Sequence, residues 1–213
     1  MAGKESRMEG YITVQGTACA TLVEKKSEFI ANLSFADTEE KALEFLDKVR
    51  SQHRTARHNV YAYCLQGQNR VRYSDDGEPA KTAGLPVLEV IQHANLTDVV
   101  VVVTRYFGGI LLGTGGLVRA YTQAAQLAVQ QAKLVCVRPV VNVQAAVEYP
   151  LYQRAARLFE EAGARVTDTV FGADVTICAT LPFGAEQGLL LALSELCRGQ
   201  EKVQVSPVYH APF

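Results

Sequence analysis

The segment Val99–Tyr121 constrains the fold of this chain more than any other. Five consecutive valines open it, five glycines follow between Gly108 and Gly116, and a helical pattern then runs from Leu117 to Ala132. A run of β-branched residues favours a buried strand, and glycine permits backbone angles and close approaches that other residues do not. We therefore expect a buried strand that leads through a glycine-rich loop into a helix, whose N-terminus offers free N–H groups to an anion.

Turn and breaker residues divide the chain into two predicted domains, residues 1–135 and 136–213. In the second domain we expect strand, helix, strand, strand, helix and strand at residues 140–147, 149–162, 165–171, 174–181, 182–197 and 202–206. This β-α-β-β-α-β order is typical of the ferredoxin-like fold. The first domain mixes the two kinds of element as well, so the predicted class is α+β.

The first predicted domain begins with two strands and a helix. Alternating apolar residues predict strands at residues 17–23 and 29–33. Asp37 or Thr38 is the expected N-cap of the helix that follows, with acids in its first turn. Further strands are expected at residues 60–65 and 71–73, with a hairpin turn at residues 67–69, and a second helix over residues 82–95.

Composition narrows the class of protein. The formal net charge is −1, which argues against a general nucleic-acid binder. No run of 18 apolar residues and no signal-peptide core are present, so we expect a cytoplasmic protein with no membrane contact. The five cysteines are scattered without a CxxC pair. Four of them lie in apolar patterns and are expected to be small core residues, and no metal or cofactor is expected.

The glycine-rich loop has two interpretations. In the first, the loop binds a phosphate or a closely approaching partner. In the second, it is a tight crossover with a structural role only. It matches neither the GxxxxGK[ST] nor the GxGxxG nucleotide motif. Arg105 and Arg119 bracket the loop and are expected to face one anion or a phosphate backbone. The alternative for these arginines is an ordinary salt bridge to the acidic turn described next.

Three acids surround Gly77 in the turn that follows the predicted strand at residues 71–73. Asp75, Asp76 and Glu78 are interpreted either as a magnesium site or acid/base pair, or as turn-forming and helix-capping carboxylates. Hard-metal sites draw ligands from several segments, and no such further ligands are evident in the sequence.

A short basic segment, Arg50 to His58, ends the first helix. Cations there suit the helix dipole, and the alternative is an RNA-facing patch that includes Arg57 and His58 and extends to Arg70, Arg72 and Lys81. Neither a GxSxG elbow nor an HExxH motif is present, so no catalytic residue is assigned and an enzyme is the less favoured interpretation.

Two segments together resemble the YigZ/Impact family. They are Ser74–Pro79 with Thr82–Gly84 and Pro86, and the run Arg105–Tyr121 with its glycines. The resemblance implies a first domain of the ribosomal S5 domain 2-like type and a domain pair similar to domains IV and V of elongation factor G. Eukaryotic relatives regulate translation by competing for the activator protein of the amino-acid starvation kinase. The RWD domain of those relatives is expected to be absent here, and the family brings no catalytic residue set.

Three functional hypotheses follow. The favoured one is a non-enzymatic, translation-associated regulator that binds RNA, the ribosome or a ribosome-bound protein through the loop. The alternatives are a small-molecule or nucleotide-phosphate enzyme with Asp75 or Asp76 on Mg²⁺, and a protein-interaction module acting through apolar loop residues such as Ile110 and Leu111. The predicted binding residues are Arg57, His58, Arg72, Asp75, Asp76, Glu78, Lys81, Thr82, Arg105, Tyr106, Phe107, Gly108, Gly109, Gly113, Gly115, Gly116 and Arg119.

Overall fold

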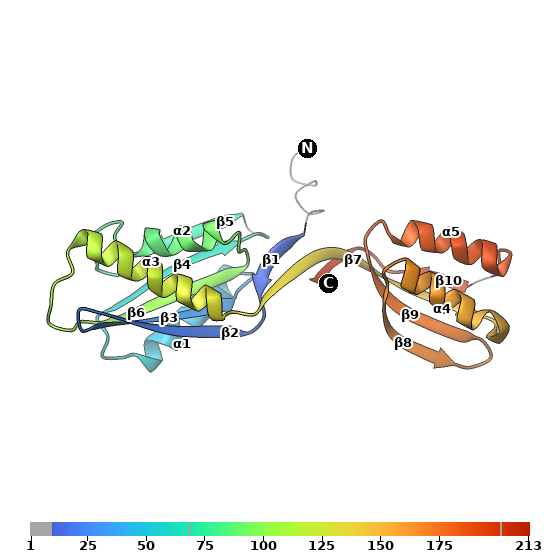
Figure 1. Cartoon of the computed structure of the whole chain (residues 1–213), viewed down its shortest axis with the longest axis horizontal. Helices are drawn as coiled ribbons and strands as arrows, with labels where there is room; N and C mark the ends of the chain where they lie inside the picture. The colour runs from blue at the N-terminus through green and yellow to red at the C-terminus, as the bar shows by residue number, and fades with distance from the viewer. Residues whose placement is uncertain (1–9, 68, 201) are drawn as a thin grey trace. The chain divides into compact units, whose positions relative to one another are not determined.

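The computed structural model describes residues 10–67, 69–200 and 202–213. Residues 11–136 and residues 137–213 form two compact units, each with its own sheet and helices (Figure 1). Strand β7 (Leu134–Val147) begins in the first unit and continues in the second. The α+β, two-domain fold expected from the sequence is confirmed. No helix in the described part of the chain is both long and apolar enough to cross a membrane.

The first unit is built on a five-stranded antiparallel sheet in the order β2-β3-β6-β4-β5. Its strands are β2 (Thr17–Glu24), β3 (Ser27–Phe35), β4 (His58–Leu65), β5 (Arg70–Ser74) and β6 (Val99–Tyr106), preceded by β1 (Tyr11–Val14). The valines of β6 are fully buried because this central strand is covered on both faces. The predicted valine strand is therefore the middle of the core.

Helices cover both faces of this sheet. Helices α2 (Gly84–His93) and α3 (Thr114–Gln131) pack on one face and α1 (Glu39–Gln52) on the other (Figure 1). The predicted N-cap of α1 is confirmed at Thr38, whose side chain accepts a hydrogen bond from the Lys41 N–H. Helix α3 begins three residues before the expected Leu117, because the chain enters the helical conformation directly after Gly113.

The second unit shows the predicted β-α-β-β-α-β order. Strands β7, β8 (Arg165–Phe171), β9 (Val175–Pro182) and β10 (Lys202–Val205) alternate with α4 (Tyr152–Glu161) and α5 (Glu186–Cys197), and both helices contribute to the core on one face of the sheet. The strands run in the order β7-β9-β8, and β10 pairs with β7.

Element boundaries in the second unit differ from the prediction, and one strand is additional. Tyr149–Leu151 forms a 3₁₀ turn ahead of α4. The second helix begins at Glu186 rather than Pro182, because Pro182 is the last residue of β9. A further strand, β11 (Tyr209–Pro212), pairs with the first part of β7 and is not predicted from the sequence.

We predict that Gly84→Ala destabilises the first unit. A Cβ at this position would lie 2.7 Å from the carbonyl carbon and oxygen of Ser74, so α2 would have to move away from β5. We expect a loss of about 2 kcal/mol in the free energy of unfolding, measured by urea denaturation. Gly115→Ala is the matched control, since nothing except the end of the Arg119 side chain lies within 4 Å, and it should be neutral or slightly stabilising. Equal effects of the two substitutions would contradict this packing argument.

Candidate functional site

A buried ion pair joins the acidic turn to the strand before the glycine-rich loop. The Arg105 Nη1 donates to Glu78 Oε1 at 2.7 Å, with 8% and 4% of the two side chains exposed. The Tyr121 hydroxyl on α3 donates to the same oxygen at 2.8 Å. Burial, followed by the nearby Glu78 charge, raises the pKa of Tyr121. The cluster therefore connects the turn, β6 and α3 in the interior.

Two aromatic rings complete the surroundings of Arg105. Its guanidinium lies 5.5 Å from the ring centre of Phe29 and 5.6 Å from that of Phe107, distances suited to cation–π attraction. The alternative of an ordinary salt bridge to the acidic turn is thus confirmed for Arg105, with Glu78 as its partner. The Arg105 and Glu78 side chains are both buried, so neither is accessible to an external ligand.

The other two acids of the turn hold the backbone. Asp75 accepts hydrogen bonds from the N–H groups of Lys81, Ala83 and Gly84, which places its carboxylate at the start of α2. Asp76 accepts from the Asn59 N–H at 2.6 Å and from Arg50 at 3.3 Å.

This pattern matches the turn-forming and helix-capping interpretation. Within residues 10–67, 69–200 and 202–213, no group of three or more His, Cys, Asp or Glu side chains is placed to hold a metal.

The residues of the predicted basic patch take part in separate interactions. His58 Nδ1 is 2.8 Å from the Asp76 carbonyl oxygen, and His53 Nδ1 is 3.0 Å from the Tyr106 hydroxyl. Arg70 and Arg72 both pair with Glu39.

The pKa of Glu39 is lowered chiefly by the hydrogen bond from Tyr63, and also by these arginines. Arg57 and Lys81 are exposed, and the Thr82 hydroxyl donates to the Pro79 carbonyl.

The glycines have distinct structural roles. A Cβ on Gly108 would lie 2.0 Å from the Lys26 carbonyl group, so the loop crosses the β2–β3 turn in direct backbone contact. Gly109 and Gly113 have φ of 83° and 74°, which favour glycine. Gly115 and Gly116 lie in the first turn of α3 rather than in the loop. The crossover interpretation of the loop is therefore supported by its geometry.

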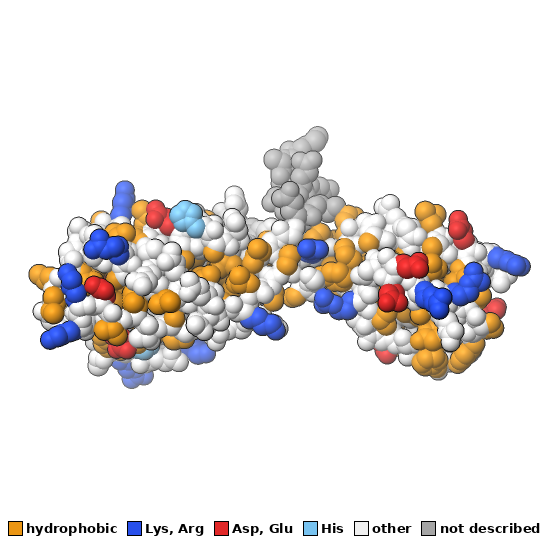
Figure 2. All heavy atoms as spheres, in the orientation of Figure 1, with side chains coloured by type: hydrophobic (Ala, Val, Ile, Leu, Met, Phe, Trp, Pro, Cys, Tyr) orange, Lys and Arg blue, Asp and Glu red, His pale blue; other side chains and the backbone are white. Residues whose placement is uncertain are grey.

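The loop leaves large apolar side chains in solvent. Phe107 is 52% exposed, Ile110 42%, Leu111 82% and Val118 36%. The exposed Arg119 reaches back over the first turn of α3, toward Gly115. We call Phe107, Ile110, Leu111, Val118 and Arg119 the loop face. Figure 2 shows hydrophobic and basic side chains together at the surface where the loop before α3 lies, at the left end of the view.

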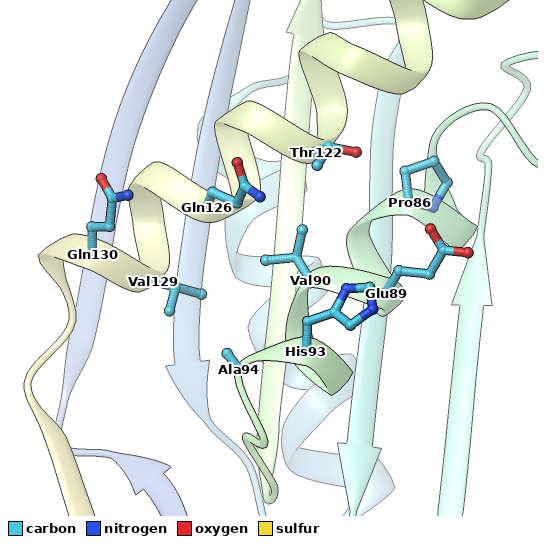
Figure 3. Close-up of a pocket in the computed structure, with 9 residues that line it drawn as sticks. All are labelled: Pro86, Glu89, Val90, His93, Ala94, Thr122, Gln126, Val129 and Gln130. Carbon is cyan, nitrogen blue, oxygen red and sulfur yellow. The ribbon is translucent and has the colours of Figure 1, made fainter.

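A shallow groove between α2 and α3 was not anticipated from the sequence. It encloses about 620 Å³. Val90 points between the two helices, with Glu89 and His93 on the α2 side and Gln126 on the α3 side (Figure 3). Polar residues on the outer face of an amphipathic helix look the same in sequence whether or not a groove lies beneath them.

Known protein families match both units. Residues 25–129 match the Impact N-terminal domain, and residues 146–200 match a domain of unknown function, DUF1949. Among curated proteins, the IMPACT family member YigZ of Escherichia coli (strain K12) is 34% identical over 187 residues, covering 85% of this chain and 92% of that protein.

Other relatives match over shorter spans. The IMPACT family member YvyE of Bacillus subtilis (strain 168) is 47% identical over 115 residues, 54% of this chain and 53% of that protein. The Protein IMPACT homolog of Dictyostelium discoideum is 37% identical over 98 residues, 44% of this chain and 28% of that protein. A crystal structure described as a hypothetical protein is 31% identical with a TM-score of 0.61, covering 92% of this chain and 97% of that chain.

We predict that Glu78→Gln strongly destabilises the first unit. The substitution keeps the shape of the side chain but leaves the Arg105 charge buried without a counter-charge, which costs about 3–5 kcal/mol. Tyr121→Phe removes only one neutral donor to that carboxylate and should cost about 1 kcal/mol. Denaturant unfolding of both variants measures the difference. A cost for Glu78→Gln no larger than that for Tyr121→Phe would show that the ion pair does not hold the turn in place.

Proposed function

The chain belongs to the Impact family, and from this premise we propose that it is a non-enzymatic, translation-associated protein that docks on a ribosome-bound protein through its loop face. The family resemblance supplies the link to translation, because eukaryotic relatives act there by binding a protein. The exposed apolar side chains of the loop face indicate how such a partner would be bound. The observation that carries the proposal is the exposure of Leu111, at 82%, together with that of three further apolar side chains on the loop and the start of α3.

The chemistry of the loop face suits a protein partner. Apolar and aromatic side chains form the centres of protein interfaces, and charged residues are depleted there. Phe107 and Leu111 are side chains of this kind, on a loop whose backbone at Gly108 packs against Lys26 and donates a hydrogen bond to the Ser27 hydroxyl. A loop held in one conformation loses little further freedom on binding, so more of the contact energy remains for affinity.

RNA is the less favoured partner. Phosphate binding depends on several accessible cations, and Arg105 is already committed to Glu78. The exposed cations near the loop include Arg119, Lys25 and Lys26, and also Arg57, which directly precedes the His58–Arg105 pair of the sheet. The β2–β3 turn that carries the two lysines is flanked by Glu24 and Glu28, which offset their charge, so few cations remain for phosphate contacts.

The nucleotide-phosphate enzyme is also less favoured. Asp75 and Asp76, which would hold magnesium in that hypothesis, accept hydrogen bonds from backbone N–H groups. The loop glycines are accounted for by backbone geometry without a phosphate. Phe107 also packs against Arg105, which leaves Ile110 and Leu111 as the loop residues whose exposure these contacts do not explain.

We predict that Leu111→Asp abolishes association with ribosomes while leaving the fold intact. An exposed side chain can be replaced without disturbing the core, whereas a charge in the centre of an interface is costly to bury. Co-sedimentation with ribosomes from the native cell should fall at least tenfold. Leu191→Asp, at a position 69% exposed on α5, is the matched control and should sediment like the wild type.

Salt dependence separates the two classes of partner. Binding through the apolar loop face should survive a moderate rise in salt concentration, whereas phosphate contacts weaken steeply. Association that is unaffected by Leu111→Asp but lost with Arg119→Glu and at raised salt would indicate RNA and overturn the proposal. Absence of any association at low salt would also overturn it.

A further inference from the structure

Strand β2 lies at the edge of the five-stranded sheet. Among the described residues it pairs only with β3, in an uninterrupted register from Thr17 to Glu24. Its outer edge therefore carries a row of N–H and C=O groups with no strand beside them. Such an edge is a ready template for another extended segment.

This edge has none of the protection that edge strands usually carry. Residues 17–23 contain no charge, no proline and no glycine, and the pairing with β3 has no bulge. Strands β5 and β8, at two other sheet edges, differ. Strand β5 presents Arg70 and Arg72 within five residues. Strand β8 carries Arg165 and Asp168, with a register shift between Val166 and Asp168. Charges and bulges are the ordinary means by which proteins prevent pairing between edges.

The turn geometry identifies which groups on β2 face outward. Lys25 and Lys26, both with positive φ (46° and 63°), form a two-residue turn closed by the pair Glu24 and Ser27. The residues that flank a two-residue turn point their backbone groups at each other, and the direction alternates along the strand. The outward N–H and C=O groups therefore belong to the odd-numbered residues from Thr17 to Val23.

The helix beside this edge is almost uncharged. Helix α3 packs against β2 through the core that includes Ala18, Ala20 and Leu22, and its 18 residues include one charge, Arg119. Of its exposed glutamines, Gln126 and Gln130 line the groove with α2, and Gln123 and Gln131 lie outside it. A helix with one charge, packed beside an uncharged strand edge, keeps the charge near that edge low, as is typical of an interface centre.

We propose that β2 pairs antiparallel with β2 of a second copy of this chain, about a two-fold axis at Ala20. Cys19 then lies opposite Thr21 of the second copy, and Thr17 lies opposite Val23. Glu24 lies opposite Gly16, so no like charges meet across the axis. A second copy is the occupant that this edge fits, because the strand is complementary to itself and a two-fold contact closes both edges at once.

Cysteine cross-linking tests the register. In Thr21→Cys the new thiol lies opposite Cys19 of the second copy, within the Cα separation that a disulfide needs. Mild oxidation should give a disulfide-linked dimer in non-reducing electrophoresis. Thr17→Cys is the matched control, since it is exposed on the same strand and face but lies opposite Val23. Cross-linking of Thr21→Cys no faster than that of Thr17→Cys would overturn the register.

Light scattering across a concentration series tests the dimer itself. The wild-type chain should pass from monomer to dimer as concentration rises. Thr21→Pro removes an outward N–H that the β2–β3 ladder does not use, and Thr21→Lys adds a charge; both should remain monomeric. Thr21→Val keeps a neutral β-branched side chain and should dimerise like the wild type. Circular dichroism confirms that each variant is folded.

A wild-type chain that stays monomeric throughout the series would overturn the proposal. Dimers that persist in both folded Thr21→Pro and Thr21→Lys would do the same, because they would place the contact elsewhere. Neither result bears on the loop face, whose substitution at Leu111 is measured by ribosome association.

Discussion

The buried ion pair between Glu78 and Arg105 is the interaction on which the first unit depends. A buried pair of this kind adds little net stability compared with apolar residues of similar size. It is nevertheless costly to break, because the charge that remains is buried without water or a counter-charge. Its value is therefore specificity: a single carboxylate oxygen accepts from β6 and from Tyr121 on α3. That carboxylate thereby joins the acidic turn, the strand and the helix in the arrangement observed.

This constraint explains how the two segments that carry the family resemblance meet. Residues 74–86 and 105–121 are separated in the chain by most of α2 and of β6, yet Glu78 from the first contacts Arg105 and Tyr121 from the second. The same arrangement also determines what the loop can offer. Arg105 is withdrawn into the interior and Gly108 is pressed against the β2–β3 turn. The loop residues that remain accessible are mainly apolar, which is why a protein partner is proposed in preference to a phosphate.

Much of the fold is predictable from local pattern. The valine strand, the Thr38 cap and the β-α-β-β-α-β order follow from periodicity and turn chemistry, which act within a few residues. Boundaries that depend on distant contacts were not predictable. Helix α5 starts late because Pro182 completes a strand paired with Val140, and β11 forms only where the end of the chain meets β7.

In the candidate site too, features that depend on local sequence are predictable and features that depend on distant packing are not. The sequence identifies the acidic turn and the arginines as neighbours, and it offers Glu78 among three possible partners for an ion pair. It does not show which acid is chosen or that Arg105 is buried, because that choice depends on how α2 and β6 pack. The sequence leaves open whether the apolar loop residues lie in the core or at the surface. In the structure they are exposed, on a loop whose backbone contacts Lys26 at Gly108.

Hydrogen–deuterium exchange of the chain, free and bound to ribosomes, tests the central claim most directly. Loop amides outside the sheets and helices exchange quickly in the free chain, so protection by a partner is readily detected. We predict protection concentrated in residues 107–119, with little change on β8 and β9. Bound chain whose residues 107–119 gain no protection, or protection confined to residues 137–213, would contradict the assignment of the loop face as the docking surface.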